Sequence, residues 1–419
     1  MMVENVNTSA MKRPIMAISP KAKARKMRVK VSIQKSIRPV SRASVITRST
    51  YCNFLKQSKM TVSEQDIRAV LARTTDPLTG KAYDEMIASM DLSGGSWRLT
   101  LAPGYPAQEG GGDVFRPLRD ALAAVGVESV DLLVQPRIQS HRVRAGVDRV
   151  PGVKNIVAVA SGKGGVGKST TAVNLALALR DEGAKVGILD ADIYGPSVPL
   201  LLNVSGKPES QDGKTMEPLV GHGIKSNSIG YLIDADAPAI WRGPMVTQAL
   251  EQLLRQTRWG DLDYLVVDMP PGTGDIALTL AQRVPVTGAV IVTTPQDIAL
   301  LDAVKGARMF EKVEVPVLGI IENMAVHVCS QCGHVEHLFG EGGARKMAQQ
   351  FNVGVLGSLP LALAVREDAD AGQPTVARSP ESEVASMYRQ IARNLAGQVA
   401  ALPRDMSSKF PSVVVEKKR

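Results

Sequence analysis

The chain has 419 residues, with 50 Lys and Arg against 41 Asp and Glu, 44% hydrophobic residues and three cysteines. This length allows two or three domains, and the ordinary composition excludes a wholly disordered chain. No uncharged apolar run approaches the roughly 18 residues that a membrane-spanning helix needs. Three cysteines are too few for the disulfide framework of a small secreted domain. We therefore expect a globular protein of a reducing compartment, the cytoplasm.

The net charge of +9 comes from the first 60 residues, which carry 14 Lys and Arg and one acidic residue. The remaining residues, 61–419, hold 36 basic and 40 acidic residues, so the body of the protein shows no sign of a nucleic-acid surface. We interpret residues 1–60 as a disordered basic leader. It is either a mitochondrial transit peptide, which would place the protein in the matrix, or sequence translated ahead of a start at Met60.

Residues 61–140 have the pattern of a small α+β unit. A helix is expected over 64–74, with Ser63 as its N-cap. Alternating apolar residues predict paired strands over 87–92 and 97–101, and a further helix and strand are expected over 114–125 and 129–135. The polar, Arg-rich stretch 141–153 is expected to be a linker.

From residue 154 to 403 the pattern is that of an α/β domain. Short, nearly continuous apolar runs occupy 156–160, 186–189, 264–267, 289–293 and 317–321. Amphipathic stretches lie between them at 170–180, 247–255 and 302–310, and another covers 380–403, before a tail over 404–419. Runs without alternation are typical of strands buried on both faces, so the sequence predicts a parallel sheet covered by helices.

A phosphate-binding motif follows the first of these predicted strands: Gly162-Lys163-Gly164-Gly165-Val166-Gly167-Lys168-Ser169. In this strand–loop–helix context, the backbone N–H groups and the start of the helix are expected to bind phosphate. Lys168 is expected to contact the β- and γ-phosphates, Ser169 to ligate Mg²⁺, and Thr170 to contact the nucleotide as well. No guanine-recognition motif is present, but composition alone does not choose between ATP and GTP.

Four polar residues follow later predicted strands. Asp190 and Asp192 are expected at the carboxyl edge of the sheet, with Asp192 positioning the attacking water and Asp190 in the outer shell of the metal. Asp268 ends an apolar run and is expected to bind Mg²⁺ through water, before a Pro-Pro-Gly-Thr-Gly stretch suited to a switch loop. The amide of Asn323 is complementary to the edge of adenine.

Cys329 and Cys332 form a C-x-x-C pair within the nucleotide-binding domain. Thiolates bind iron or zinc, but a metal centre needs about four ligands and one chain supplies two cysteines here. Three interpretations are open: a [4Fe–4S] cluster shared by two chains, a zinc site that uses His327, His334 or His337, and a redox-active pair.

The loop GKGGVGKS resembles the deviant phosphate loop of MinD and the nitrogenase iron protein. That resemblance implies ATP as the nucleotide, a dimer, and a catalytic Lys163 that reaches the nucleotide of the partner. From 154 to 396 the chain also resembles the Mrp/ApbC-type iron–sulfur cluster carrier ATPases. This resemblance rests on Trp241-Arg242-Gly243-Pro244-Met245, Trp259-Gly260-Asp261-Leu262-Asp263-Tyr264, Thr294-Pro295-Gln296-Asp297, Asn323-Met324, the cysteine pair, Phe339-Gly340-Glu341-Gly342-Gly343 and Leu359-Pro360-Leu361. Residues 61–140 are similar to the MIP18-like domain that often precedes this ATPase.

The resemblance implies a weakly ATP-hydrolysing homodimer that binds a [4Fe–4S] cluster on Cys329 and Cys332 and passes it to apo iron–sulfur proteins, without nucleic acid or membrane. Two features depart from the family pattern: Ser330 replaces the usual proline, and 100–108 lacks the cysteine often found in the small domain. His334 and His337 remain candidate auxiliary ligands. The alternatives are a MinD/ParA-like positioning ATPase, a zinc-binding P-loop ATPase and a ligase of the dethiobiotin synthetase type.

Overall fold

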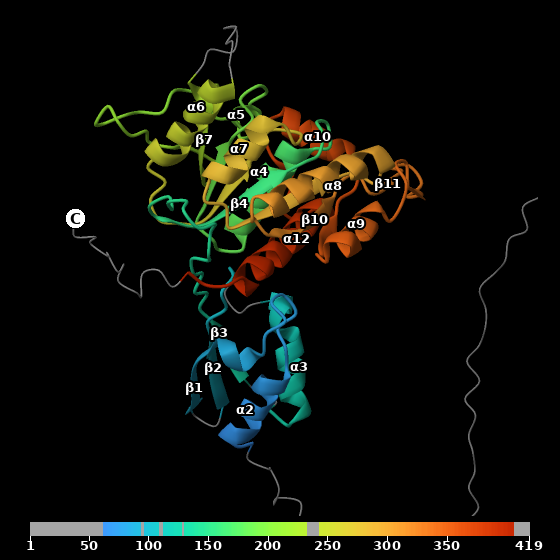
Figure 1. The fold of residues 1–419 in the computed structure, drawn as a ribbon. Coiled ribbons are helices and arrows are strands. Elements are labelled where there is room, and N and C mark those ends of the chain that lie inside the picture. The colour runs from blue at the N-terminus through green and yellow to red at the C-terminus, as the bar shows by residue number, and fades with distance from the viewer. Residues whose placement is uncertain (1–61, 94–95, 109–111, 128–129, 233–242, 406–419) are drawn as a thin grey trace, which may run out of the picture. The chain divides into compact units, whose positions relative to one another are not determined.

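The structure is a computed structural model that describes residues 62–93, 96–108, 112–127, 130–232 and 243–405 (Figure 1). The leader expected over 1–60, with Cys52, lies outside the described residues, and so does nearly all of the tail expected over 404–419. Trp241 and Arg242, which contributed to the family resemblance, also lie outside them. In the described part of the chain, no helix is both long and apolar enough to cross a bilayer.

A three-stranded sheet and two helices form the small α+β unit, as predicted. Strands β1 (Ile87–Ser93) and β2 (Ser96–Leu101) are antiparallel, and β3 (Val130–Val134) runs parallel to β2. Helix α2 (Glu64–Arg73) begins after the predicted cap, since Ser63 Oγ accepts the N–H of Asp66. Short 3₁₀ turns, η1 (Tyr83–Met86) and η2 (Gly112–Phe115), precede β1 and helix α3 (Arg116–Ala124). Buried residues of both helices and of the sheet share one core.

The second sheet has eight strands in the order β13-β10-β9-β4-β8-β5-β7-β6. Its strands are β4 (Val153–Ala160), β5 (Val186–Asp190), β6 (Leu219–Gly221), β7 (Ile224–Ser228), β8 (Leu262–Asp268), β9 (Gly288–Thr293), β10 (Val317–Glu322) and β13 (Val355–Ser358). Neighbouring strands are parallel except at one edge, where β6 is antiparallel to β7. The predicted parallel sheet is thus confirmed, with one antiparallel edge strand that the sequence did not indicate.

Helices cover both faces of this sheet (Figure 1). Val157 and Val159 of β4 point into a core shared with α4 (Lys168–Asp181), α5 (Val198–Leu201), α11 (Thr375–Arg378) and α12 (Glu383–Ala401). Ile156 and Ala158 point to the opposite core, which contains residues of α6 (Gly243–Gln256), α7 (Asp275–Arg283), α8 (Asp297–Lys312) and α9 (Gly343–Phe351). Successive residues of a strand face opposite sides of a sheet, so these strands need apolar residues at every position.

The stretch 141–153 forms no helix and contributes only its last residue to β4. It is nevertheless packed, because His141 and Val150 are buried. The ring Nδ1 of His141 lies 2.9 Å from Asn155 Oδ1. The segment expected to be a linker is therefore held against the end of β4 rather than free.

The strand order places the predicted site residues at one edge of the sheet. Strands β4, β8 and β5 are neighbours, and all three run in the same direction. Their carboxyl ends carry the phosphate loop, Asp268 and Asp190, in that order across the sheet. Asp190 and Asp268 face each other directly in the register of β5 and β8.

Candidate functional site

The phosphate loop joins β4 to α4, and two of its glycines, Gly162 and Gly167, leave no room for a side chain. A Cβ on Gly162 would lie 2.0 Å from the backbone carbon of Asp302 in α8. Gly167, with φ of +79°, is the N-cap of α4, and a Cβ there would lie 2.3 Å from Asn323 Nδ2. The loop therefore packs closely against two neighbouring elements.

Over this loop lies a hollow of about 310 Å³. It is lined by Ser161, Lys163, Gly164, Gly165, Gly167, Lys168, Ser169, Thr170, Asp192, Ser197, Leu200, Leu201, Pro271, Ala369 and Asp370. The structure thus brings most of the predicted phosphate-binding residues to one cavity, and Asp192 joins them from the loop after β5. The last two lining residues belong to α10 (Leu363–Asp370), which the sequence did not connect with the site.

Lys168 and Asp268 form a buried ion pair in this structure. Lys168 Nζ lies 2.6 Å from Asp268 Oδ1, and 3.1 Å from Ser169 Oγ. The second carboxylate oxygen, Asp268 Oδ2, is buried without a hydrogen-bond partner. An unpaired buried acceptor is costly, and it suits a water molecule bound to Mg²⁺. The hydroxyl of Ser169 beside it is a metal-ligand type, so the residues present fit the magnesium ion expected with the nucleotide.

Asp190 is fully buried and accepts three hydrogen bonds through its carboxylate. The donors are the backbone N–H of Asp192 at 3.1 Å, the N–H of Val198 at 3.1 Å and Ser228 Oγ at 3.0 Å. Burial raises the pKa of Asp190 to about 7, and the neighbouring Asp268 carboxylate acts in the same direction. Two of these donors lie at the two ends of the loop that carries Asp192, and the third, Ser228, ends β7. A place for Asp190 in the outer shell of the metal stays a prediction.

Asp192 itself is half-buried at the rim of the phosphate-loop hollow. Burial raises its pKa, while the ammonium of Lys168 opposes that shift. Asp192 also lines an adjoining hollow of about 390 Å³ together with Tyr194, Pro270 and Pro271. The loops that follow β5 and β8 therefore face each other across this second hollow, beside the place expected for the terminal phosphate.

Lys163 is anchored within its own chain. Its Nζ lies 3.4 Å from Oε1 of Gln296, the residue that precedes α8. The side chains of Ile298 and Leu301 in the same helix are exposed. Gln296 was not singled out as a site residue, since its motif contributed only to the family resemblance.

Asn323 follows β10 and lies beneath the phosphate loop. Its Nδ2 donates to the carbonyl of Val166 at 2.9 Å, so part of the amide holds the loop in place. Contact of Asn323 with adenine, through its Oδ1 and the second proton of Nδ2, remains a prediction.

Cys329 and Cys332 lie on a small hairpin made by β11 (His327–Val328) and β12 (Val335–Glu336). The N–H of Cys329 donates to the carbonyl of His334 at 2.9 Å. The N–H of Gln331, then the N–H and thiol of Cys332, lower the pKa of the Cys329 thiol. A lowered pKa favours the thiolate, which is the form that binds metal.

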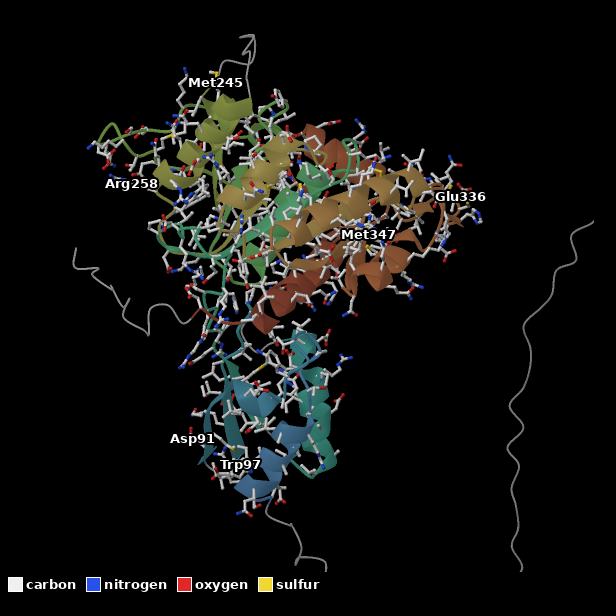
Figure 2. The ribbon with its side chains drawn as sticks, in the orientation of Figure 1. Asp91, Trp97, Met245, Arg258, Glu336 and Met347 are labelled. Carbon is white, nitrogen blue, oxygen red and sulfur yellow. The ribbon has the colours of Figure 1, made fainter. Side chains whose placement is uncertain are left out.

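The hairpin is exposed, and Figure 2 shows its labelled residue Glu336 at the periphery. Within the described residues, no three His, Cys, Asp or Glu side chains are grouped so that they could hold a metal. His327 instead places Nδ1 3.3 Å from the carbonyl of Leu361. One chain thus presents two thiols on this hairpin, without a third grouped side-chain ligand among the described residues.

Replacing Asp190 with asparagine is expected to change how folding stability depends on pH. The pKa of Asp190 rises from 3.8 to about 7 on folding, so between these values the folded protein holds a proton that the unfolded chain has lost. The cost of ionising this buried group grows as the pH rises from about 4 to about 7. The free energy of unfolding therefore falls, by up to about 1.4 kcal/mol per pH unit.

Urea unfolding of the metal-free and nucleotide-free protein across this pH range would measure the effect. In the Asp190→Asn variant, the free energy of unfolding should not show this decrease between about pH 4 and pH 7. Asp212→Asn is a suitable control, because the exposed Asp212 has a lowered pKa, owing chiefly to the N–H of Thr215, and ionises below this range. Parallel pH profiles for wild type and Asp190→Asn would contradict the expectation.

Comparison with known proteins gives the context of this site. The model of the ParA group described as NUBPL iron-transfer P-loop NTPase matches residues 152–396. The iron-sulfur cluster carrier protein of Escherichia coli (strain K12) is 58% identical over 281 residues, which is 67% of this chain and 76% of that protein. The iron-sulfur cluster transfer protein NUBPL of Mus musculus is 50% identical over 318 residues, covering 74% of this chain and 99% of that protein.

Among solved structures, a nucleotide-binding protein from Archaeoglobus fulgidus in complex with ADP is 37% identical, with a TM-score of 0.50. The match covers 57% of this chain and 94% of that one. The phosphate loop and the cysteine hairpin both fall inside the segment 152–396.

Proposed function

Since this chain belongs to the family of NUBPL-type iron-transfer P-loop NTPases, the iron–sulfur cluster carriers, we propose that it binds a [4Fe–4S] cluster between two subunits and transfers it to apo-proteins with the use of ATP. The observation that carries the proposal is the pair of free cysteines, the half-buried Cys329 and the exposed Cys332. In the described part of the chain, no third protein ligand is grouped with this pair. The same polypeptide carries a complete phosphate loop. Two such chains supply the four thiolates that a [4Fe–4S] cluster takes.

The nucleotide half of the proposal follows from the cavity over the phosphate loop. Backbone N–H groups of the loop and the start of α4 would hold the phosphates of ATP. Lys168 would exchange Asp268 for the β- and γ-phosphates, and Ser169 would ligate Mg²⁺, with Asp268 accepting from a metal-bound water. Bound Mg²⁺ would neutralise the negative charge that develops on the phosphates during transfer.

Hydrolysis would depend on the two loops that face each other beside this cavity. The carboxylate of Asp192, at the rim of the hollow, would orient the attacking water toward the γ-phosphate. Lys163 would leave Gln296 and reach the nucleotide of the second subunit, so that hydrolysis requires the dimer. This requirement would couple the ATP cycle to the assembly of the shared cluster site.

Anaerobic reconstitution with iron and sulfide tests the proposal. The wild-type protein should become brown and elute as a dimer, with about four iron and four sulfide ions per dimer. Ser330→Ala is the matched control: it removes a hydroxyl from the turn between the cysteines but leaves both thiols, so it should bind the cluster like wild type. Cys329→Ser and Cys332→Ser should each remain colourless.

Two outcomes would contradict the proposal. A colourless wild-type monomer that retains zinc under these conditions would show that the cysteine pair serves another metal. Loss of the cluster in His334→Ala or His337→Ala, with both cysteines intact, would show that histidines complete the site within one chain.

A further inference from the structure

The carboxylate of Asp190 accepts hydrogen bonds from both ends of the loop that carries Asp192. This loop leaves β5 after Asp190 and ends where α5 begins at Val198. Asp190 Oδ1 accepts the N–H of Asp192 at the start of the loop, and Oδ2 accepts the N–H of Val198 at its end. The position of the loop, and of Asp192 within it, therefore depends on the orientation of the Asp190 carboxylate.

Ser228 is the side chain that completes this arrangement. It is the last residue of β7, the neighbour of β5, and it is fully buried. Its Oγ donates to Asp190 Oδ2 at 3.0 Å and accepts the N–H of Gly230, in the short helix η3 (Ile229–Tyr231), at 3.0 Å. The Ser228 oxygen accepts the N–H of Gly230 through one lone pair. The single proton of the hydroxyl is donated to the Asp190 carboxylate, which is an acceptor.

We propose that Ser228 is a positioning residue for ATP hydrolysis: its hydroxyl orients the Asp190 carboxylate, which in turn holds Asp192 at the rim of the phosphate cavity. This inference rests on the proposed function, in which Asp192 orients the attacking water. Ser228 does not line the cavity itself, so its effect on the site would pass through its hydrogen bond to Asp190.

The geometry predicts an effect on turnover and not on nucleotide binding. Without the hydroxyl, Asp190 keeps the N–H of Asp192 on Oδ1 and the N–H of Val198 on Oδ2, but it loses the side-chain donor on Oδ2. The orientation of the buried carboxylate, and with it the position of Asp192, is then less firmly fixed. A displacement of about 1 Å in a catalytic group can lower a rate about 100-fold. The phosphates would instead be held by the loop after β4, whose hydrogen bonds do not involve Ser228.

Ser228→Ala and Ser226→Ala are the variants that test this inference. Ser226 lies two residues earlier in β7 and is equally buried, but its Oγ bonds Leu219 O at 3.1 Å and Tyr231 Oη at 2.8 Å. Both substitutions delete one buried hydroxyl from the same strand. Ser228→Ala should lower kcat for ATP hydrolysis about 10- to 100-fold, with KM and the Kd for ATP changed less than about twofold. Ser226→Ala should keep the wild-type kcat.

The outcomes separate this inference from the proposed function. If wild type does not hydrolyse ATP, or if Asp192→Asn hydrolyses it at the wild-type rate, the proposed function fails. If wild type is active and Asp192→Asn is impaired, but Ser228→Ala and Ser226→Ala give equal kcat values, the positioning role of Ser228 is overturned. A weaker Kd for ATP in Ser228→Ala that accounts for the loss of rate would also overturn it.

Discussion

Replacing Lys168 with methionine is expected to lower ATP hydrolysis about 10²- to 10³-fold, because one preorganised charge at the transferred phosphate is worth that much in comparable sites. The ion pair with Asp268 adds a second consequence that is independent of nucleotide. Lys168 and Asp268 are 6% and 0% exposed in their side chains, at an N–O distance of 2.6 Å. Removing the lysine leaves the carboxylates of Asp268 and Asp190 facing each other in the interior without a cation.

The nucleotide-free Lys168→Met variant should therefore be destabilised near neutral pH by about 3–5 kcal/mol, because breaking a buried ion pair leaves an uncompensated charge in the interior. It should recover part of this loss on acidification, because protonation of a carboxyl removes the buried charge. Urea unfolding at several pH values would measure the stability, and phosphate release would measure the rate.

Lys185→Met provides the control for this variant. Lys185 also pairs with an aspartate, Asp261, at 2.8 Å, but both side chains are more than 60% exposed. An exposed pair contributes little to stability, and this one lies outside the phosphate cavity. The substitution should leave stability and hydrolysis nearly unchanged. If Lys168→Met were as stable and as active as Lys185→Met, the buried pair would have neither of the roles argued for it.

The parts of the fold that were predictable are those with a local signal. Five strands of the large sheet were predicted because both faces are buried and nearly every position of the strand core is apolar, as in residues 264–267 of β8. Strand β7 carries no such signal, because its sequence Ile224–Ser228 is mostly polar. It is stable in the interior since Ser226, Asn227 and Ser228 each find hydrogen-bond partners on other elements or on the backbone.

Among the residues of the site, too, those with a local sequence signal were predictable and the others were not. The phosphate loop and Asp268 were predicted because a motif fixes residue types at short spacing after a strand. The partners that orient them were not, because they are distant in sequence: Gln296 beside Lys163 and Ser228 beside Asp190 come from elements that meet only in the folded chain. A serine at the end of a polar strand has no local pattern that separates it from a surface serine.

A mixture of Lys163→Ala and Asp192→Asn chains is expected to regain ATP hydrolysis that neither variant shows alone. In a mixed dimer, the site on the Lys163→Ala chain keeps its own Asp192 and would receive Lys163 from the Asp192→Asn chain. The other site lacks both groups. With random pairing, half of the dimers are mixed and each has one complete site, so the activity should reach about a quarter of the wild-type value.

This restoration depends on Lys163 acting across the interface, because a lysine that served its own chain would leave every site in the mixture defective. In the structure the Lys163 ammonium donates a long hydrogen bond of 3.4 Å to the neutral amide of Gln296, and a phosphate of the partner's nucleotide would be a stronger acceptor for it. The measurement is phosphate release over a series of mixing ratios, with a maximum expected at equal amounts of the two chains. A flat line at the background of the single variants would place Lys163 at its own nucleotide, and hydrolysis would then not require the dimer on which cluster sharing depends.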